Sequence, residues 1–132
     1  MDFSNETLKK KYSKKSNSDC GILVGELFKS RDVAHLTHLQ TTSFAEHKAL
    51  NEYYDSLLDL VDSFVEESFG IYGRYKIVIP SSAEDSNFCK HLKVLRQSIV
   101  EHREYIHETN LQNLLDEILS LIDKTCYLLT LK

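Results

Sequence analysis

The sequence predicts an all-α fold, a bundle of four helices, and three observations support this prediction. The 132 residues include only four glycines and one proline, too few turn-forming residues for a sandwich or barrel of many short strands. Apolar residues make up 42% of the chain and recur at steps of three and four residues. A chain of this length buries roughly two thirds of its unfolded surface, enough for one core without disulfide or metal support.

The first predicted helix runs from Cys20 to Gln40. Its apolar face consists of Leu23, Val24, Leu27, Phe28, Ala34 and Leu39. The preceding residues, 1–19, are rich in lysine, serine and asparagine and hold too few apolar side chains to offset the entropy of ordering. We therefore expect two parts, a flexible basic N-terminal tail over residues 1–19 and a four-helix domain over residues 20–132.

The second predicted helix begins at Ser43, which forms a capping-box pattern with Glu46, and ends at about Gly70 or Gly73. Its apolar face carries Leu50, Leu57, Val61, Phe64 and Phe69. In the region that follows, residues 75–79 read either as a short strand or as an extended connection. Because no partner strand is predicted, we expect an extended connection.

A third helix is predicted from about Ala83 to His107, and a fourth follows a second capping-box pattern at Thr109 and Gln112. Short turns therefore join the first and last pairs of helices, and a long segment joins the two pairs. Two antiparallel hairpins linked by one crossover are the connectivity of ferritin-like bundles.

Charge is divided unevenly along the chain. The net charge is −4, yet the first 19 residues carry +2 and the remaining 113 carry −6. The tail is interpreted either as a solubilising terminus or as a phosphate-binding arm for nucleic acid. In the second interpretation the binding residues are its five lysines, Lys9, Lys10, Lys11, Lys14 and Lys15.

No apolar run approaches the roughly 18 residues that cross a bilayer, and no signal-peptide pattern is present. We therefore expect no membrane contact and a cytoplasmic location. The three cysteines form no CxxC pair, so neither a disulfide framework nor a zinc knuckle is predicted. Cys89 and Cys126 are interpreted as small buried hydrophobes and Cys20 as a residue at the helix start. His91 and His102 are expected at the surface.

A polar stripe lies beside the apolar face of the second predicted helix. Its members are His47, Asn51, Asp55, Asp59, Asp62 and Glu66, and Lys48 is the single basic residue between His47 and Gly70. A solvated helix face usually alternates charges of opposite sign. The stripe is thus either a solvated face or a surface that attracts a cation or a basic partner.

Three histidines flank the turn between the first two helices. His35 lies on the apolar side of its helix, where it is either a hydrogen-bonded core residue or a metal ligand. The turn brings His35 near His47, whereas Asp62 lies about 22 Å from His47 along the helix. Two copies of the helix packed antiparallel about a two-fold axis would bring His47 of one copy to Asp62 and Glu66 of the other. The spacing predicts an intersubunit site for iron, or for zinc as a surrogate.

The pattern His35-x11-His47-x14-Asp62-x3-Glu66 resembles the ferroxidase signature of the Dps mini-ferritins, DNA-binding proteins from starved cells. The resemblance implies that both histidines come from one subunit and both carboxylates from its two-fold mate. Leu36 stands where the family often has an aromatic residue, and Asn51 where it has an acidic one. His38, Asn51, Asp55 and Asp59 would then support the ligands or guide incoming cations.

The segment from Val24 to His35 and its continuation from His47 to Tyr54 also resemble small uncharacterised proteins of tailed phages and marine viruses. Such an origin implies the cytoplasm of a bacterial host. Two functions are thus expected. One is iron binding, with ferroxidase activity, by a Dps-like homo-oligomer that could also hold DNA through its tail. The alternative is a non-enzymatic helical interaction protein that keeps the fold without metal chemistry.

Overall fold

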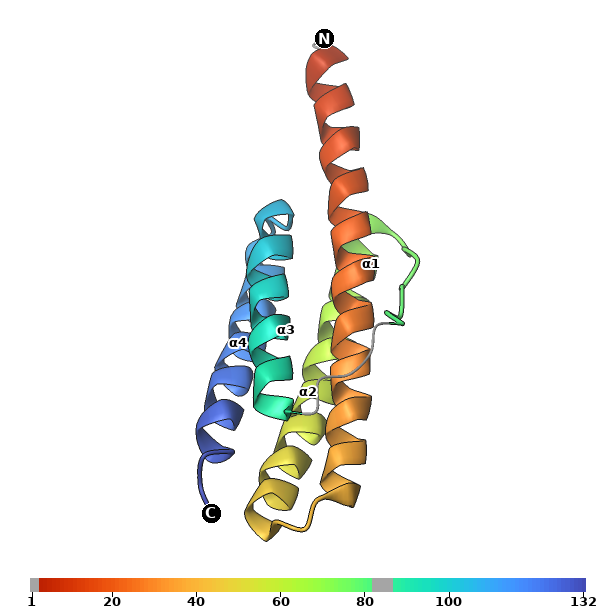
Figure 1. The fold of residues 1–132 in the computed structure, drawn as a ribbon. Helices are drawn as coiled ribbons and strands as arrows, with labels where there is room; N and C mark the ends of the chain where they lie inside the picture. The colour runs from red at the N-terminus through yellow and green to blue at the C-terminus, as the bar shows by residue number, and fades with distance from the viewer. Residues whose placement is uncertain (1–2, 82–86) are drawn as a thin grey trace.

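Four α-helices make up most of the chain that the structure describes (Figure 1). The computed structural model describes the backbone of residues 3–81 and 87–132, and side chains from Ser16 onward in these ranges. The helices are α1 (Phe3–Gln40), α2 (Phe44–Tyr72), α3 (Phe88–His102) and α4 (Thr109–Leu128), with a short 3-10 helix at Arg103–Tyr105. The described ranges contain no strand, which confirms the predicted all-α class.

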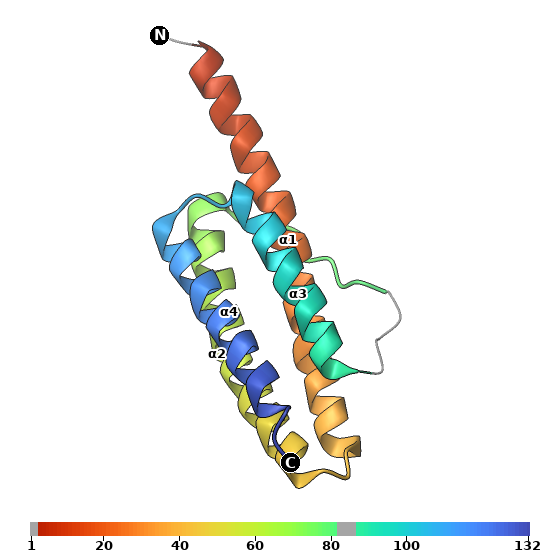
Figure 2. The same cartoon turned by 60° about the vertical axis from the view of Figure 1, so that its left-hand side comes forward.

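The helices pack as two antiparallel hairpins. α1 contacts α2 and α3, and α4 contacts the same two helices from the other side. α2 ends at one end of the bundle, and α3 begins towards the other end (Figures 1 and 2). Each helix is therefore antiparallel to both of its neighbours, and the predicted tight, long, tight order of connections is observed.

The interior is a single apolar cluster to which every α-helix contributes. Among its largest fully buried side chains are Leu23, Leu27, Leu50, Tyr53, Leu57, Phe64, Leu92, Ile99, Leu111, Leu115 and Ile118. On α1, the predicted apolar face holds as far as Ala34. Beyond it, His38 is buried, whereas Leu39 is exposed.

α1 begins at Phe3, well before the predicted start at Cys20. Lysine is a good helix former, so a basic sequence can extend a helix that packing has already nucleated. Two polar residues of the expected tail are buried: the Ser16 hydroxyl donates to the Tyr105 carbonyl at 2.5 Å, and Asp19 pairs with His102 at the same distance. His102, expected at the surface, thus anchors α1 to α3. The flexibility of the tail stays a prediction.

α2 has the predicted boundaries. The Ser43 hydroxyl accepts from the Glu46 amide at 3.2 Å, and Gly73 ends the helix with φ of 82°, a conformation that favours glycine. In a full capping box the backbone N–H of Ser43 would donate to the Glu46 side chain. Here it donates to the Thr41 hydroxyl instead.

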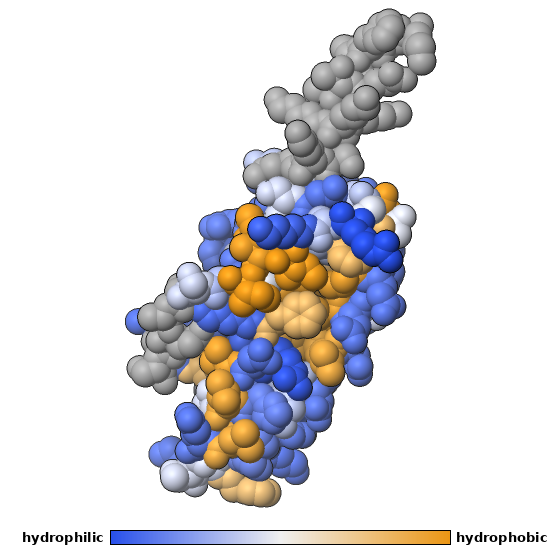
Figure 3. Space-filling view, turned by 90° about the vertical axis from the view of Figure 1, so that its right-hand side faces the viewer, coloured by the Kyte–Doolittle hydropathy of each residue, from blue (hydrophilic) through white to orange (hydrophobic). Residues whose placement is uncertain are grey.

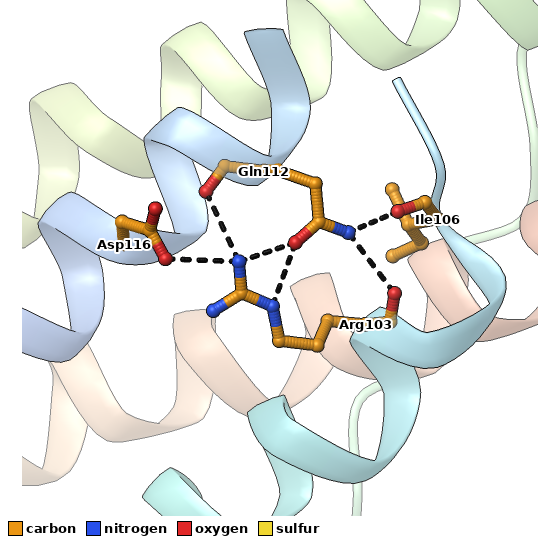
Figure 4. A network of polar contacts seen from close by, with 4 residues as sticks. All are labelled: Arg103, Ile106, Gln112 and Asp116. Atoms are coloured by element: carbon orange, nitrogen blue, oxygen red, sulfur yellow. Dashed lines mark hydrogen bonds and ion pairs between the residues drawn. The ribbon is translucent and has the colours of Figure 1, made fainter. Parts of the chain in front are cut away.

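The second predicted capping box, at Thr109, is wrong. Thr109 is already helical, and Glu108 precedes it without a side-chain cap. The side-chain NH2 group of Gln112 instead donates to the backbone carbonyls of Arg103 and Ile106, and the side-chain oxygen of Gln112 accepts from the Arg103 guanidinium (Figure 4). Arg103 also pairs with Asp116 at 2.9 Å, so this network holds the corner between α3 and α4.

α3 begins at Phe88, after Asn87, whose side chain accepts from the Lys90 amide. The predicted start at Ala83 falls within residues 82–86, outside the described residues. The third helix is also interrupted earlier than expected, since the 3-10 turn replaces the α-helix after His102. Residues 73–81, which include Pro80, form neither a helix nor a strand, so this segment is a connection, as predicted.

The connection after α2 lies directly on α1. The Val78 amide donates to the Gly21 carbonyl at 3.1 Å. A methyl group added at Gly21 would overlap the carbonyl oxygen of Lys76, and one added at Gly25 would overlap that of Val78. Both obstructing atoms belong to the backbone, so a side-chain rotation cannot relieve the overlap.

We expect Gly25→Ala to lower the free energy of unfolding by about 1–3 kcal/mol, because the connection must move away from α1. Urea denaturation measures the change. Gly70→Ala is the matched control, because an added methyl there meets nothing within 4 Å and Gly70 lies in a helix. That variant should be more stable than the native protein by about 0.5–1 kcal/mol, and equal destabilisation of both variants would contradict the packing argument.

Candidate functional site

The turn between α1 and α2 places the last turn of one helix beside the first turn of the other. Only residues 41–43 separate the helices, and the Thr41 amide still donates to the Thr37 carbonyl at 2.9 Å. The Ser43 cap then starts α2 at once. His38 on α1 therefore lies against His47 on α2, and His35 lies one turn earlier on α1, with its ring centroid 6.1 Å from that of His38.

His38 and His47 form a stacked pair. Their ring centroids are 3.6 Å apart with an angle of 18° between the planes. His38 Nδ1 lies 2.6 Å from the His47 carbonyl oxygen, and His47 Nδ1 lies 2.7 Å from that of His38. A carbonyl only accepts, so each Nδ1 carries the hydrogen, and in the neutral form of each ring the lone pair is on Nε2.

His35 extends this cluster towards the acidic stripe of α2. Its ring stacks on Tyr54 at 4.4 Å, and the Tyr54 hydroxyl donates to the Asn51 side-chain oxygen at 2.7 Å. The Asn51 amide group in turn donates to Asp55 at 3.3 Å. Asn51 thus joins the aromatic cluster to the first carboxylate of the stripe.

A positive charge lies beside the cluster. The Arg31 guanidinium carbon is 5.5 Å from the centre of the Tyr54 ring, and Arg31 pairs with Asp32 at 3.1 Å. Asp32 is largely exposed, so this pair offsets the field of Arg31 only in part. The site is therefore less favourable to a bare cation than the three histidines alone would make it.

The predicted carboxylate ligands lie elsewhere on α2. Asp62 and Glu66 are exposed, and Asp62 lies about 22 Å along the helix from His47. Within the described residues, no group of three or more histidine, cysteine or acidic side chains could hold a metal ion in one chain. The structure therefore places His35 and His47 on the two sides of the turn, each beside the His38 ring, and places the carboxylates farther along α2. Whether a second chain supplies them stays a prediction.

The carboxylates of the acidic stripe are exposed and lack basic partners within the described residues, as the sequence indicates. Asp55, Asp59, Asp62 and Glu66 are all exposed. In the part of the chain that the structure describes, none of the four pairs with a basic side chain, and only Asp55 has a hydrogen bond, from Asn51.

Apolar side chains surround the histidine end of the hairpin. Leu36, Leu39 and Phe44 expose 58%, 65% and 78% of their surface, respectively. Further apolar surface is visible on the face formed by α1 and the connection (Figure 3). Exposed apolar residues gathered near one end of a small domain favour a contact surface there.

The sequence predicted that five lysines of the tail could bind nucleic acid. Lys9, Lys10, Lys11, Lys14 and Lys15 lie on the N-terminal part of α1, where the helix extends beyond the bundle (Figure 2). Their side chains are outside the described residues, so nucleic-acid binding by the tail stays a prediction. None of the helices in the described ranges combines the length and hydropathy needed to cross a bilayer.

The sequence did not predict a polar network in the interior of the bundle. The Ser30 hydroxyl lies 2.6 Å from the Tyr53 hydroxyl and 3.1 Å from His91 Nε2, so His91 is not the surface residue that the sequence predicted. Burial raises the pKa of the Tyr53 phenol, which therefore remains neutral. Ser30 is fully buried, so this serine and histidine connect three helices and are not placed to attack a substrate.

A family model described as "Family of unknown function (DUF5856)" matches residues 38–129. The chain belongs to DUF5856. The matched range begins at His38 and includes His47, Asp62 and Glu66, whereas His35 precedes it.

A phage protein is similar to most of this DUF5856 chain. An uncharacterised 14.6 kDa protein from the mobD-ri intergenic region of Enterobacteria phage T4 is 30% identical over 112 residues, which are 83% of this chain and 86% of the relative. The predicted resemblance to uncharacterised phage proteins is thereby confirmed. No solved structure matches the chain.

We expect Ser30→Ala to destabilise the fold by about 1–3 kcal/mol, because the buried Tyr53 hydroxyl loses its partner. Thermal unfolding followed by circular dichroism measures this loss. Ser120→Ala is the control, because Ser120 is exposed on α4 and alanine favours a helix. If the two variants melt alike, the buried network contributes nothing to stability.

Proposed function

We propose that this DUF5856 chain is a Dps-like, ferritin-like homo-oligomer that binds ferrous iron between subunits. The ligands are His35 and His47 of one subunit and Asp62 and Glu66 of its two-fold mate. The observation that carries the proposal is the fixed orientation of His47, whose Nδ1 is held by the His38 carbonyl. Metal-binding histidines commonly donate their second nitrogen to a carbonyl in this way, which leaves Nε2 for the metal.

The acidic stripe supplies the second half of the proposed site. Its carboxylates are exposed, and within the described residues they have no basic partner. Two antiparallel copies of α2, paired about a point between Ser56 and Leu57, would set His47 opposite Glu66 and Asn51 opposite Asp62. The apolar side chains of Leu36, Leu39 and Phe44 at the hairpin end provide surface that such an interface would bury.

The donor set fits iron. Neutral imidazole binds ferrous iron without adding charge, and carboxylates stabilise the ferric product, whose charge is higher. Iron is the substrate, and peroxide or dioxygen takes its electron. Zinc, which prefers the same nitrogen and oxygen donors, serves as a redox-inactive surrogate. His38, Asn51, Asp55 and Asp59 orient the ligands or attract the incoming cation.

The second candidate function is that of a helical interaction protein without metal chemistry. One observation favours it, the Arg31 guanidinium beside the Tyr54 ring on which His35 stacks. In that case the acidic stripe binds a basic partner surface, and the stacked histidines only join α1 to α2.

We expect the native protein to oxidise added Fe(II) faster than buffer alone, followed by absorbance. Asp62→Asn should slow the reaction about tenfold or more, because it removes a ligand charge. Glu117→Gln on α4 removes the same charge from an exposed position outside the stripe and should leave the rate unchanged. Rates equal to buffer for all three proteins would favour the interaction protein.

Mixing two inactive variants tests whether the site lies between subunits. His47→Ala and Asp62→Asn subunits each lack one half of every site, but a mixed dimer of the two contains one intact site. Unfolding and refolding the two together should restore about a quarter of the native activity, because half of the random dimers are mixed. A mixture as inactive as its components, from subunits that light scattering shows to be dimers or larger, would overturn the two-fold site.

A further inference from the structure

A cavity lies between the start of α3 and the end of α4. Its volume is about 520 Å³, within the range of small-molecule sites. Cys89 lines it from the first turn of α3 and Cys126 from the last turn of α4, with Thr37 and Glu46 closing it from the α1–α2 hairpin. Both cysteines are half-buried, so each thiol has a path to solvent.

The two thiols are neighbours within this cavity. Burial raises the pKa of Cys126 to about 11, and a hydrogen bond with Cys89 adds to the shift. The first turn of α3 and the last turn of α4 hold both thiols on the wall of the same cavity. Two cysteines can form a disulfide where their Cα atoms lie within about 7 Å of each other.

The cavity selects for a small, neutral reactant. The Glu46 carboxylate at its wall repels anions, and the Cys126 thiol is protonated at neutral pH. A hydroperoxide is neutral under these conditions and is small compared with the cavity. It is also the class of oxidant that converts two adjacent thiols to a disulfide.

We propose that Cys89 and Cys126 form a dithiol site that hydrogen peroxide oxidises to a disulfide joining α3 to α4. In the first step one thiolate attacks the peroxide, the O–O bond breaks, and a sulfenic acid and hydroxide form. In the second step the other sulfur displaces the sulfenic hydroxyl as water. Overall, two thiols lose two electrons and two protons, and peroxide is reduced to two molecules of water.

The bond would tie together the two ends of the second hairpin. It closes a loop of about 38 residues that contains the turn at Arg103. The cross-link removes conformations from the unfolded chain without needing any new contact in the folded one. We expect the oxidised protein to melt roughly 10 °C higher than the reduced protein, and dithiothreitol should abolish the difference.

Intact-mass measurement of the full chain after hydrogen peroxide treatment tests the proposal. We expect a loss of about 2 Da, the mass of two hydrogens. Digestion without reduction should then yield one linked pair of peptides containing Cys89 and Cys126. Cys89→Ser and Cys126→Ser should each abolish the mass loss.

Cys20→Ser is the matched control and should keep the mass loss in full. Cys20 is fully buried and does not line the cavity, so it should not take part. Separate addition of oxygen to the cysteines, disulfides between chains, or no reaction of the native protein would each overturn the proposal. If a serine variant fails to fold, the peptide map and the melting temperature of the native protein still decide.

Discussion

The connection between α2 and α3 lies against α1 at the two points where α1 has no side chain. Gly21 and Gly25 are one helical turn apart, and the carbonyls of Lys76 and Val78 occupy the space of their missing methyl groups. The Tyr75 ring is fixed at the same place by Ser68 and Phe69, at the end of α2. This packing guides the chain back along α1, so that α3 starts at the end of the bundle where α1 meets α2.

The two ends of the bundle consequently differ in character. One end holds the stacked histidines, the exposed Leu36, Leu39 and Phe44, and the cysteine cavity. The other end holds contacts that join helices, among them Asp19 with His102 and Arg103 with Gln112. The stacked histidines and the cysteine cavity thus lie away from the contacts that keep α1, α3 and α4 in register.

The sequence predicted features that depend on near neighbours and missed those that depend on distant ones. Ser43 and Gly73 are the caps at the two ends of α2, and each acts on residues close to it in the sequence, so both ends were predicted. The start of α1 was not, because the partners of Ser16 and Asp19 are Tyr105 and His102.

The remaining differences between the predictions and the structure involve side chains that have more than one possible partner. Gln112 matched a capping pattern, yet its amide bonds to carbonyls of the preceding turn. Cys89 and Cys126 read as separate hydrophobes, since only the pairing of α3 with α4 in the second hairpin brings these distant residues to one cavity. The gathering of histidines at this end of the hairpin was predictable because three residues separate their helices, but the stacking of His38 on His47 was not predicted. Pairing with Asp62 depends on a second chain, which no single-chain pattern determines.

The burial of Ser16 and Asp19 places the edge of the cooperative folding unit inside α1. A fragment that starts at Cys20 would lose the hydroxyl that bonds to Tyr105 and the carboxylate that bonds to His102. Its lower stability would then be mistaken for an effect of the missing lysines. A fragment that starts at Ser16 separates the two effects, since it removes all five lysines and keeps both anchors.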